Sequence, residues 1–154
     1  MTIDEQVEKR VYNRLRAYDG VEVAGHAPVD SSIASVLSEG EVLADNGEQY
    51  SSIQQAVDVS DGFVFVGPGT YYENVVIDKD DFTLQGAGHD TLIDGGNVDN
   101  SITVNSDDVV LTSIKVTNQG IQVNGQNPHI ESVFVQGSFF GINLNGAAGA
   151  TVVG

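Results

Sequence analysis

Short segments in which apolar and polar residues alternate recur through the last third of the chain. The segment Ile102–Asn105 (ITVN) returns as Ile121–Asn124 (IQVN) and as Ile142–Asn145 (INLN), at spacings of 19 and 21 residues. Alternation with a period of two is typical of β-strands that bury one side. Segments this short cannot bury that side alone, so the repeat predicts strands that stack on one another.

A second strand follows the first in each repeat. Leu111–Val116 (LTSIKV) aligns with Ile130–Val135 (IESVFV), and Leu84 stands in the same relation to an earlier, longer copy that begins at Val75–Asp78. Thr151–Val153 begins one more second strand. We therefore predict an all-β fold, a right-handed parallel β-helix or solenoid with coils of about 20 residues.

An asparagine ends each of the three best copies of the repeat, at Asn105, Asn124 and Asn145. Stacked coils place these three side chains one above another, so we expect their amides to hydrogen-bond along the stack as a structural ladder. The alternative is that each is an ordinary turn residue, because asparagine is common in turns.

Residues 3 to 18 follow a helical pattern instead. Apolar residues recur at spacings of three and four, and Thr2 with Glu5 forms a capping box at the start. The apolar stripe is narrow, as in a coiled coil, and the polar sides carry four of the six positive charges in the chain. The residues expected to assemble the protein through this helix are Val7, Val11, Leu15, Arg10 and Arg14. The alternative is a helix that packs on its own domain.

Residues 20 to 48 contain short apolar pieces broken by glycine, proline and an Asn-Gly pair, a pattern that predicts a linker or small adaptor. We therefore divide the chain into an N-terminal helix with its adaptor, residues 1 to 48, and a β-helix, residues 49 to 154. A capping helix over residues 52 to 59 opens the β-helix, with Ser51 and Gln54 as its capping box. Its apolar face is expected to cover the open end of the sheet stack, which would otherwise expose unpaired backbone.

The charge of the chain bears on its surroundings. It has 22 acidic and six basic residues, a formal net charge of −16, and the acids are scattered instead of clustered. Such a surface repels itself at low ionic strength and is screened in strong salt, which favours a halophilic source. An acidic protein from moderate salt, or one loaded with calcium, is the alternative. Free nucleic acid is an unsuitable partner, because phosphate binding needs a stripe of basic residues.

The N-terminus lacks the apolar core of a signal peptide, and no segment approaches the roughly 18 apolar residues of a membrane-spanning helix. We expect neither export by a signal peptide nor membrane insertion.

No catalytic constellation is visible in the sequence. His26, His89 and His129 share no position in the repeat, and acid pairs such as Asp107 and Asp108 arise by chance in so acidic a chain. We predict no cofactor, with calcium as the alternative. The residues that offer oxygen ligands for calcium are Asp78, Asp80 and Asp81 in one turn, and Asp94, Asn97 and Asp99 in another.

Six segments between residues 50 and 96 carry a family resemblance: SIQQAVD, FVFV, GPGTYYE, VVI, FTLQGAG and TLIDGG. Together they resemble the opening of pectin-lyase-like β-helix proteins, a superfamily that includes pectinesterases, polysaccharide lyases and phage tailspikes. The resemblance implies the fold more than an activity, since one fold carries many functions. Pectinesterase-like chemistry implies paired aspartates, glutamines and an arginine on central coils, and the chain has no arginine after Arg16.

These observations favour a virion surface protein of a virus that infects a halophilic archaeon, as a tail fibre, tailspike or capsid-decorating turret subunit. Residues 1 to 48 would attach it to other virion proteins after assembly in the host cytoplasm, and the β-helix would meet a host surface glycan or glycoprotein. Tailspikes of this kind are homotrimers, so we predict three chains. The alternatives are a truncated carbohydrate-active enzyme or sugar-binding module, and a structural protein of the host.

Overall fold

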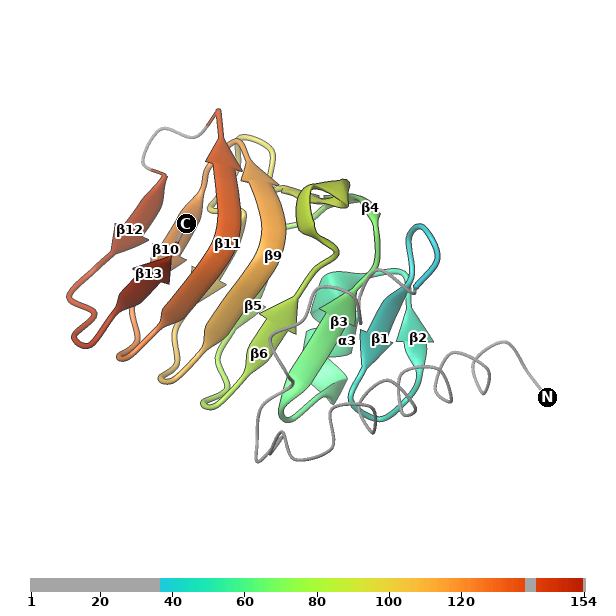
Figure 1. The fold of residues 1–154 in the computed structure, drawn as a ribbon, viewed down its shortest axis with the longest axis horizontal. Coiled ribbons are helices and arrows are strands. Elements are labelled where there is room, and N and C mark those ends of the chain that lie inside the picture. The colour runs from blue at the N-terminus through green and yellow to red at the C-terminus, as the bar shows by residue number, and fades with distance from the viewer. Residues whose placement is uncertain (1–36, 138–140, 154) are drawn as a thin grey trace.

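The computed structural model describes residues 37–137 and 141–153, and these residues form a parallel β-helix (Figure 1). One sheet of four strands stacks a single segment from each coil, in the order β12-β10-β8-β5. The register places Ile102, Ile121 and Ile142 side by side, so the repeat seen in the sequence is the coil of the solenoid. The strands of this sheet are β5 (Val75–Ile77), β8 (Ile102–Val104), β10 (Ile121–Val123) and β12 (Ile142–Leu144).

The other strands join a nine-stranded sheet that wraps the remaining sides of the coils. Its main path runs β13-β11-β9-β6-β3-β1-β2, and a side branch pairs β4 with β7 and β7 with β9. The strands of the path are β1 (Val42–Ala44), β2 (Gln49–Tyr50), β3 (Phe63–Val66), β6 (Thr83–Gln85), β9 (Val110–Thr117), β11 (His129–Gln136) and β13 (Thr151–Val153). Those of the branch are β4 (Gly69–Tyr72) and β7 (Thr91–Asp94).

Each coil has three sides because β9 and β11 bend in the middle. The first half of β9 pairs with β6 and the second half with β7. At the bend Ser113 has a φ of 58°, and Ser132 has a φ of 53° at the matching position of β11. This left-handed conformation is uncommon outside glycine, and here it turns a continuous strand round a corner.

Alternate residues of the strands fill the interior. Within a coil, Ile102 and Val104 are fully buried whereas Thr103 between them points outward and is half-buried. The interior is built almost wholly from branched aliphatic side chains, which suit the close spacing of stacked strands. Its aromatic members are Tyr71 and Phe82.

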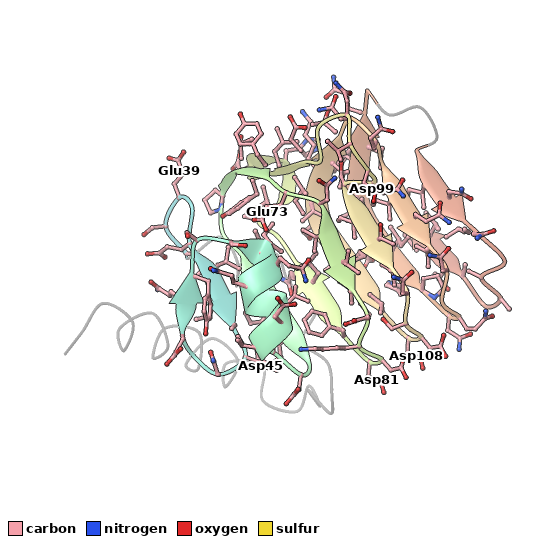
Figure 2. The ribbon with its side chains drawn as sticks, turned by 180° about the vertical axis from the view of Figure 1, so that it is seen from behind. Glu39, Asp45, Glu73, Asp81, Asp99 and Asp108 are labelled. Carbon is pink, nitrogen blue, oxygen red and sulfur yellow. The ribbon has the colours of Figure 1, made fainter. Side chains whose placement is uncertain are left out.

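Helix α3 (Ile53–Val59) covers the first coil and buries Ile53, Ala56 and Val57 against it (Figure 2). The sequence places this capping helix correctly, but its capping residue is Ser52, not Ser51. The Ser52 hydroxyl accepts the backbone N–H of Gln55 at 3.4 Å. Since Ser51 and Ser52 are adjacent, local spacing alone does not choose between them; packing of the apolar face does.

The structure places part of the expected adaptor inside the sheet. Strands β1 and β2 form an antiparallel hairpin around Asn46-Gly47, and β1 pairs with β3. Val42 and Ala44 of β1 belong to the interior core. The Asn-Gly pair is therefore the turn of a hairpin, for which it is well suited, and the hairpin extends the large sheet beyond the first coil.

Candidate functional site

The three asparagines at the ends of β8, β10 and β12 lie one above another. The amide nitrogen of Asn124 donates to Asn105 Oδ1 at 2.7 Å, and that of Asn145 donates to Asn124 Oδ1 at 3.2 Å. All three side chains are exposed. The ladder continues onto the outer side of the sheet, where Asn143 donates to Gln122 and Gln122 donates to Asn124.

A second ladder, which the sequence analysis missed, runs along the same turn two residues later. The Asp107 N–H donates to Asp80 Oδ1, and the Gln126 N–H donates to Asp107 Oδ1, both at 2.8 Å. Gln126 Oε1 in turn accepts the Ala148 N–H at 2.8 Å. The signal was present in the sequence for Asp80, Asp107 and Gln126, because these three residues are offset by the same intervals as the strands before them.

The turn ridge, which we define as residues 78–81, 105–108, 124–127 and 145–148, is acidic at its N-terminal end. Asp81 and Asp108 lie at the same edge of consecutive coils (Figure 2) and both have a positive φ, at 57° and 59°. Asp108 accepts the amide of Asn127 from the next coil at 3.2 Å. Carboxylates and amides of the ridge are thus used to join coils.

Several of the oxygen ligands considered for calcium accept hydrogen bonds from within the chain. Asp80 accepts the Asp107 N–H, and Asp94 accepts the Gly96 N–H and the amide of Asn118. Over the described ranges, no group of three or more His, Cys, Asp or Glu side chains is placed to hold a metal ion. The absence of a cofactor stays a prediction, and calcium stays the alternative to it.

A surface with exposed rings lies on the third side of the coils, where β4, β7, β9 and β11 run together. The outward side chains of Leu92, Lys115 and Phe134 are in register on adjacent strands. Phe134 is 43% exposed, and the ring of His89 stacks on it with centroids 3.7 Å apart. His89 comes from the 3-10 turn η1 (Gly88–Asp90), which folds over β9 from an earlier coil.

Tyr72 extends this surface on β4. It is 79% exposed and is paired in register with Asp94, whose strand neighbours on the outer side are Thr117 and Gln136. Aromatic rings beside hydrogen-bonding side chains on a stiff sheet form a surface suited to ligands that have both apolar and hydroxyl-bearing faces. We call this surface the aromatic face; it comprises Tyr72, His89, Leu92, Asp94, Lys115, Thr117, Phe134 and Gln136.

The two lysines of the described residues have different surroundings. Lys79 Nζ donates to the carbonyls of Val57, Asp58 and Ser60 at the end of α3. Lys115 lies on the aromatic face, half-buried between Leu92 and Phe134. Lys115 is therefore the lysine whose ammonium group faces outward beside an exposed ring.

Tyr71 and His129 make contacts within the chain. The Tyr71 hydroxyl donates to the Gly67 carbonyl at 2.9 Å, and burial, with the nearby carboxylates of Glu73, Glu41 and Glu39, raises its pKa well above the usual value for tyrosine. His129 lies 3.5 Å from Glu131 on the outer side of β11, far along the strand from His89. His26 lies outside the described residues.

The residues expected to assemble the protein, Val7, Val11, Leu15, Arg10 and Arg14, also lie outside the described residues. Within the described part of the chain, no helix has the length and apolar character needed to cross a membrane.

The fold is established by the structure itself, because comparison with known proteins adds nothing to it. No family model, no curated protein and no solved structure matches the chain. The parallel β-helix stands on the strand pairing described above, whereas membership of the pectin-lyase-like superfamily stays a proposal.

Proposed function

We propose that this chain is a surface structural protein of a virus that infects a halophilic archaeon, as a tail fibre, tailspike or capsid-decorating turret subunit. In this proposal the β-helix displays a binding surface for attachment to the host cell, and residues 1 to 48 join the protein to other virion proteins. The observation that carries the proposal is the aromatic face, where exposed rings stand on a stack of coils held together by side-chain ladders.

The ladders support a display function because they make the platform stiff. Each coil is joined to the next by backbone pairing on its sides and by amide or carboxylate contacts at the turn ridge. A binding surface on a rigid scaffold loses less conformational entropy on binding than one on a loop. The exposed rings of Tyr72 and Phe134 are thus presented in a fixed arrangement.

The charge of the chain supports a saline setting. Residues 37 to 154 contain 16 acidic residues and two lysines, and one of those lysines is engaged at the end of α3. The excess of acidic side chains produces electrostatic repulsion, and molar salt screens this repulsion within roughly 3 Å. In that setting the protein would bind a cell surface through short-range contacts, such as those of the aromatic face, because long-range electrostatic attraction is screened as well.

Light scattering in molar salt tests the assembly part of the proposal, on the full chain and on a chain that lacks residues 1 to 20. We expect a trimer that falls to a monomer on truncation. A monomer in both cases would rule out a self-assembling spike and leave a module that docks singly into a larger particle.

Attachment is tested by binding the labelled protein to haloarchaeal cells and to their isolated surface glycans in molar salt. Replacement of the two exposed rings, Tyr72→Ala and Phe134→Ala, should each weaken binding by at least about tenfold, because aromatic residues commonly dominate binding surfaces. Val76→Ala is the control, since Val76 is 39% exposed on β5, which belongs to the four-stranded sheet. Equal binding by all three variants would remove the aromatic face from the proposal.

A sugar-binding module, or a carbohydrate-active enzyme cut short, is the second candidate, and the aromatic face favours its binding form too. Acidic polysaccharides incubated with the protein distinguish the two. A drop in polymer length would identify an enzyme, whereas binding without turnover, together with assembly through the N-terminus, would favour the virion protein.

A further inference from the structure

A group of side chains on the outer side of the large sheet is buried although it faces away from the core. Leu43 of β1 is paired with Phe65 of β3, and Phe65 is paired with Gln85 of β6. Leu43 is 2% exposed, and Phe65 and Gln85 are 0% exposed. We define the outer strip as Leu43, Phe63, Phe65, Thr83 and Gln85.

The alternation of the strands shows that the outer strip points outward. Val42, Val64 and Leu84 are members of the interior core, and their neighbours in sequence therefore lie on the opposite side of the sheet. Leu43 and Phe65 do not belong to the interior core cluster. Their burial thus requires a cover on the outside of the solenoid.

The chain enters the described structure beside this strip. Leu37 is 3% exposed and, like Leu43 and Phe65, stands outside the interior core cluster. A Cβ atom added at Gly67, directly after β3, would lie 3.0 Å from the Leu37 Cβ atom. The residues that precede Leu37 therefore start next to the end of the strand that carries Phe63 and Phe65.

We propose that residues 21 to 36 are the cover, and that they dock on the outer strip of their own chain. The strip is uncharged, and this segment carries only two formal charges, Glu22 and Asp30, beside several apolar residues. Residues 21 to 36 directly precede Leu37, whereas residues 3 to 18 are at least 19 positions away from it along the chain. The apolar residues available in the segment are Val21, Val23, Ala24, Ala27, Val29, Ile33, Ala34 and Val36.

The consequence is that the whole adaptor belongs to the folded solenoid. The reach is sufficient, because an extended chain covers about 3.3 Å per residue and neighbouring strands are about 4.8 Å apart. The docking of residues 21 to 36 does not depend on the proposed viral function.

Cysteine reactivity in the full-length chain tests the proposal, since the protein has no native cysteine. Thr83→Cys reports on the outer strip, Thr103→Cys on the outer side of the four-stranded sheet, and Val104→Cys on the interior. We expect the thiol at position 83 to react with a maleimide at least roughly tenfold more slowly than the thiol at position 103, at every protein concentration.

Aspartates introduced into residues 21 to 36 should weaken their docking and expose the outer strip. Ile33→Asp with Val36→Asp should raise the reactivity at position 83 at least roughly tenfold while position 104 stays protected. The matched control, Val7→Asp with Val11→Asp, should leave position 83 protected. If position 104 also becomes reactive, the chain has unfolded, and Ile33→Ala with Val36→Ala repeats the comparison without added charge.

Four results would overturn the inference. They are a reactive thiol at position 83 in the otherwise unchanged chain, protection that survives both pairs of substitutions in the adaptor, loss of protection with the pair at positions 7 and 11, and protection that falls on dilution. The third would assign the strip to the N-terminal helix, and the fourth to a second copy of the chain.

Discussion

Two charged residues that flank β5 hold the ends of helix α3. Glu73 accepts the N–H groups of Ile53 and Gln54, at 2.8 and 3.0 Å, and Lys79 donates to the three carbonyls at the other end. A helix of seven residues is too short to be stable by itself. An acid at the N-terminal end and a cation at the C-terminal end satisfy the unpaired backbone groups and the helix dipole.

Lys79→Met should therefore lower the free energy of unfolding by about 1–3 kcal/mol, because three carbonyls at the end of α3 lose a charged donor. Lys115→Met is the matched control and should change the free energy by less than about 0.5 kcal/mol. Chemical denaturation in molar salt measures both. An equal effect of the two substitutions would mean that Lys79 acts through the net charge alone.

The asparagine ladder should contribute modestly at each step, because its members are exposed to water. Asn124 makes a hydrogen bond to the coil on either side, and Asn124→Ala removes both. We expect a loss of about 1 kcal/mol in the free energy of unfolding. Asn97→Ala, at an exposed loop position, is the control and should be close to neutral when measured by the same denaturation.

At the scale of the element, the turn ridge requires a residue without a side chain where two coils meet most closely. A Cβ atom at Gly125 would lie 1.7 Å from the Ser106 carbonyl oxygen of the preceding coil. Gly146 occupies the equivalent position one coil later and has nothing within 4 Å, although its φ is 76°. The two glycines therefore differ, because Gly125 packs tightly against the preceding coil and Gly146 does not.

Gly125→Ala should cost about 3 kcal/mol or more, since the added methyl group forces consecutive coils apart. Gly146→Ala should cost only about 1 kcal/mol, the penalty of a left-handed conformation for alanine. Thermal unfolding of the two variants in the same salt compares them. Equal midpoints would show that the ridge adjusts to the methyl group without separating the coils.

The bends of the long strands show how an element departs from its local pattern. Leu111–Val116 and Ile130–Val135 look like continuous strands in the sequence, and the structure pairs them on either side of Ser113 and Ser132. It also turns each one at a serine with positive φ, so a single strand serves two sides of the coil. No local preference of serine predicts this conformation; it results from the closure of the coil.

At the scale of the whole molecule, charge repulsion acts along the solenoid as far as the coil that contains Glu131. The described residues have few cations to offset their acids, and the turn ridge places carboxylates from successive coils near one another. We expect the midpoint of thermal unfolding to rise by several degrees between about 0.1 M and 2 M potassium chloride, as screening becomes stronger. A midpoint that is independent of salt would contradict the halophilic interpretation of the surface.

The sequence by itself determined the repeat, the stacking of coils, the capping helix and the positions of Asn105, Asn124 and Asn145. These features depend on local alternation and on a constant interval, and both are properties of the chain read in one dimension. Parallel pairing then follows, because stacking equivalent segments is the way in which such short strands bury their apolar sides.

Only the tertiary structure decided which distant residues meet. His89 reaches Phe134 across β9, Glu73 and Lys79 bracket a helix some 20 residues earlier in the chain, and Leu43 completes a strip with Phe65. The physical reason is that these contacts depend on the exact path of loops and corners between strands. Loops carry little periodic signal, and a shift of one residue reverses the side of the sheet on which a side chain lies.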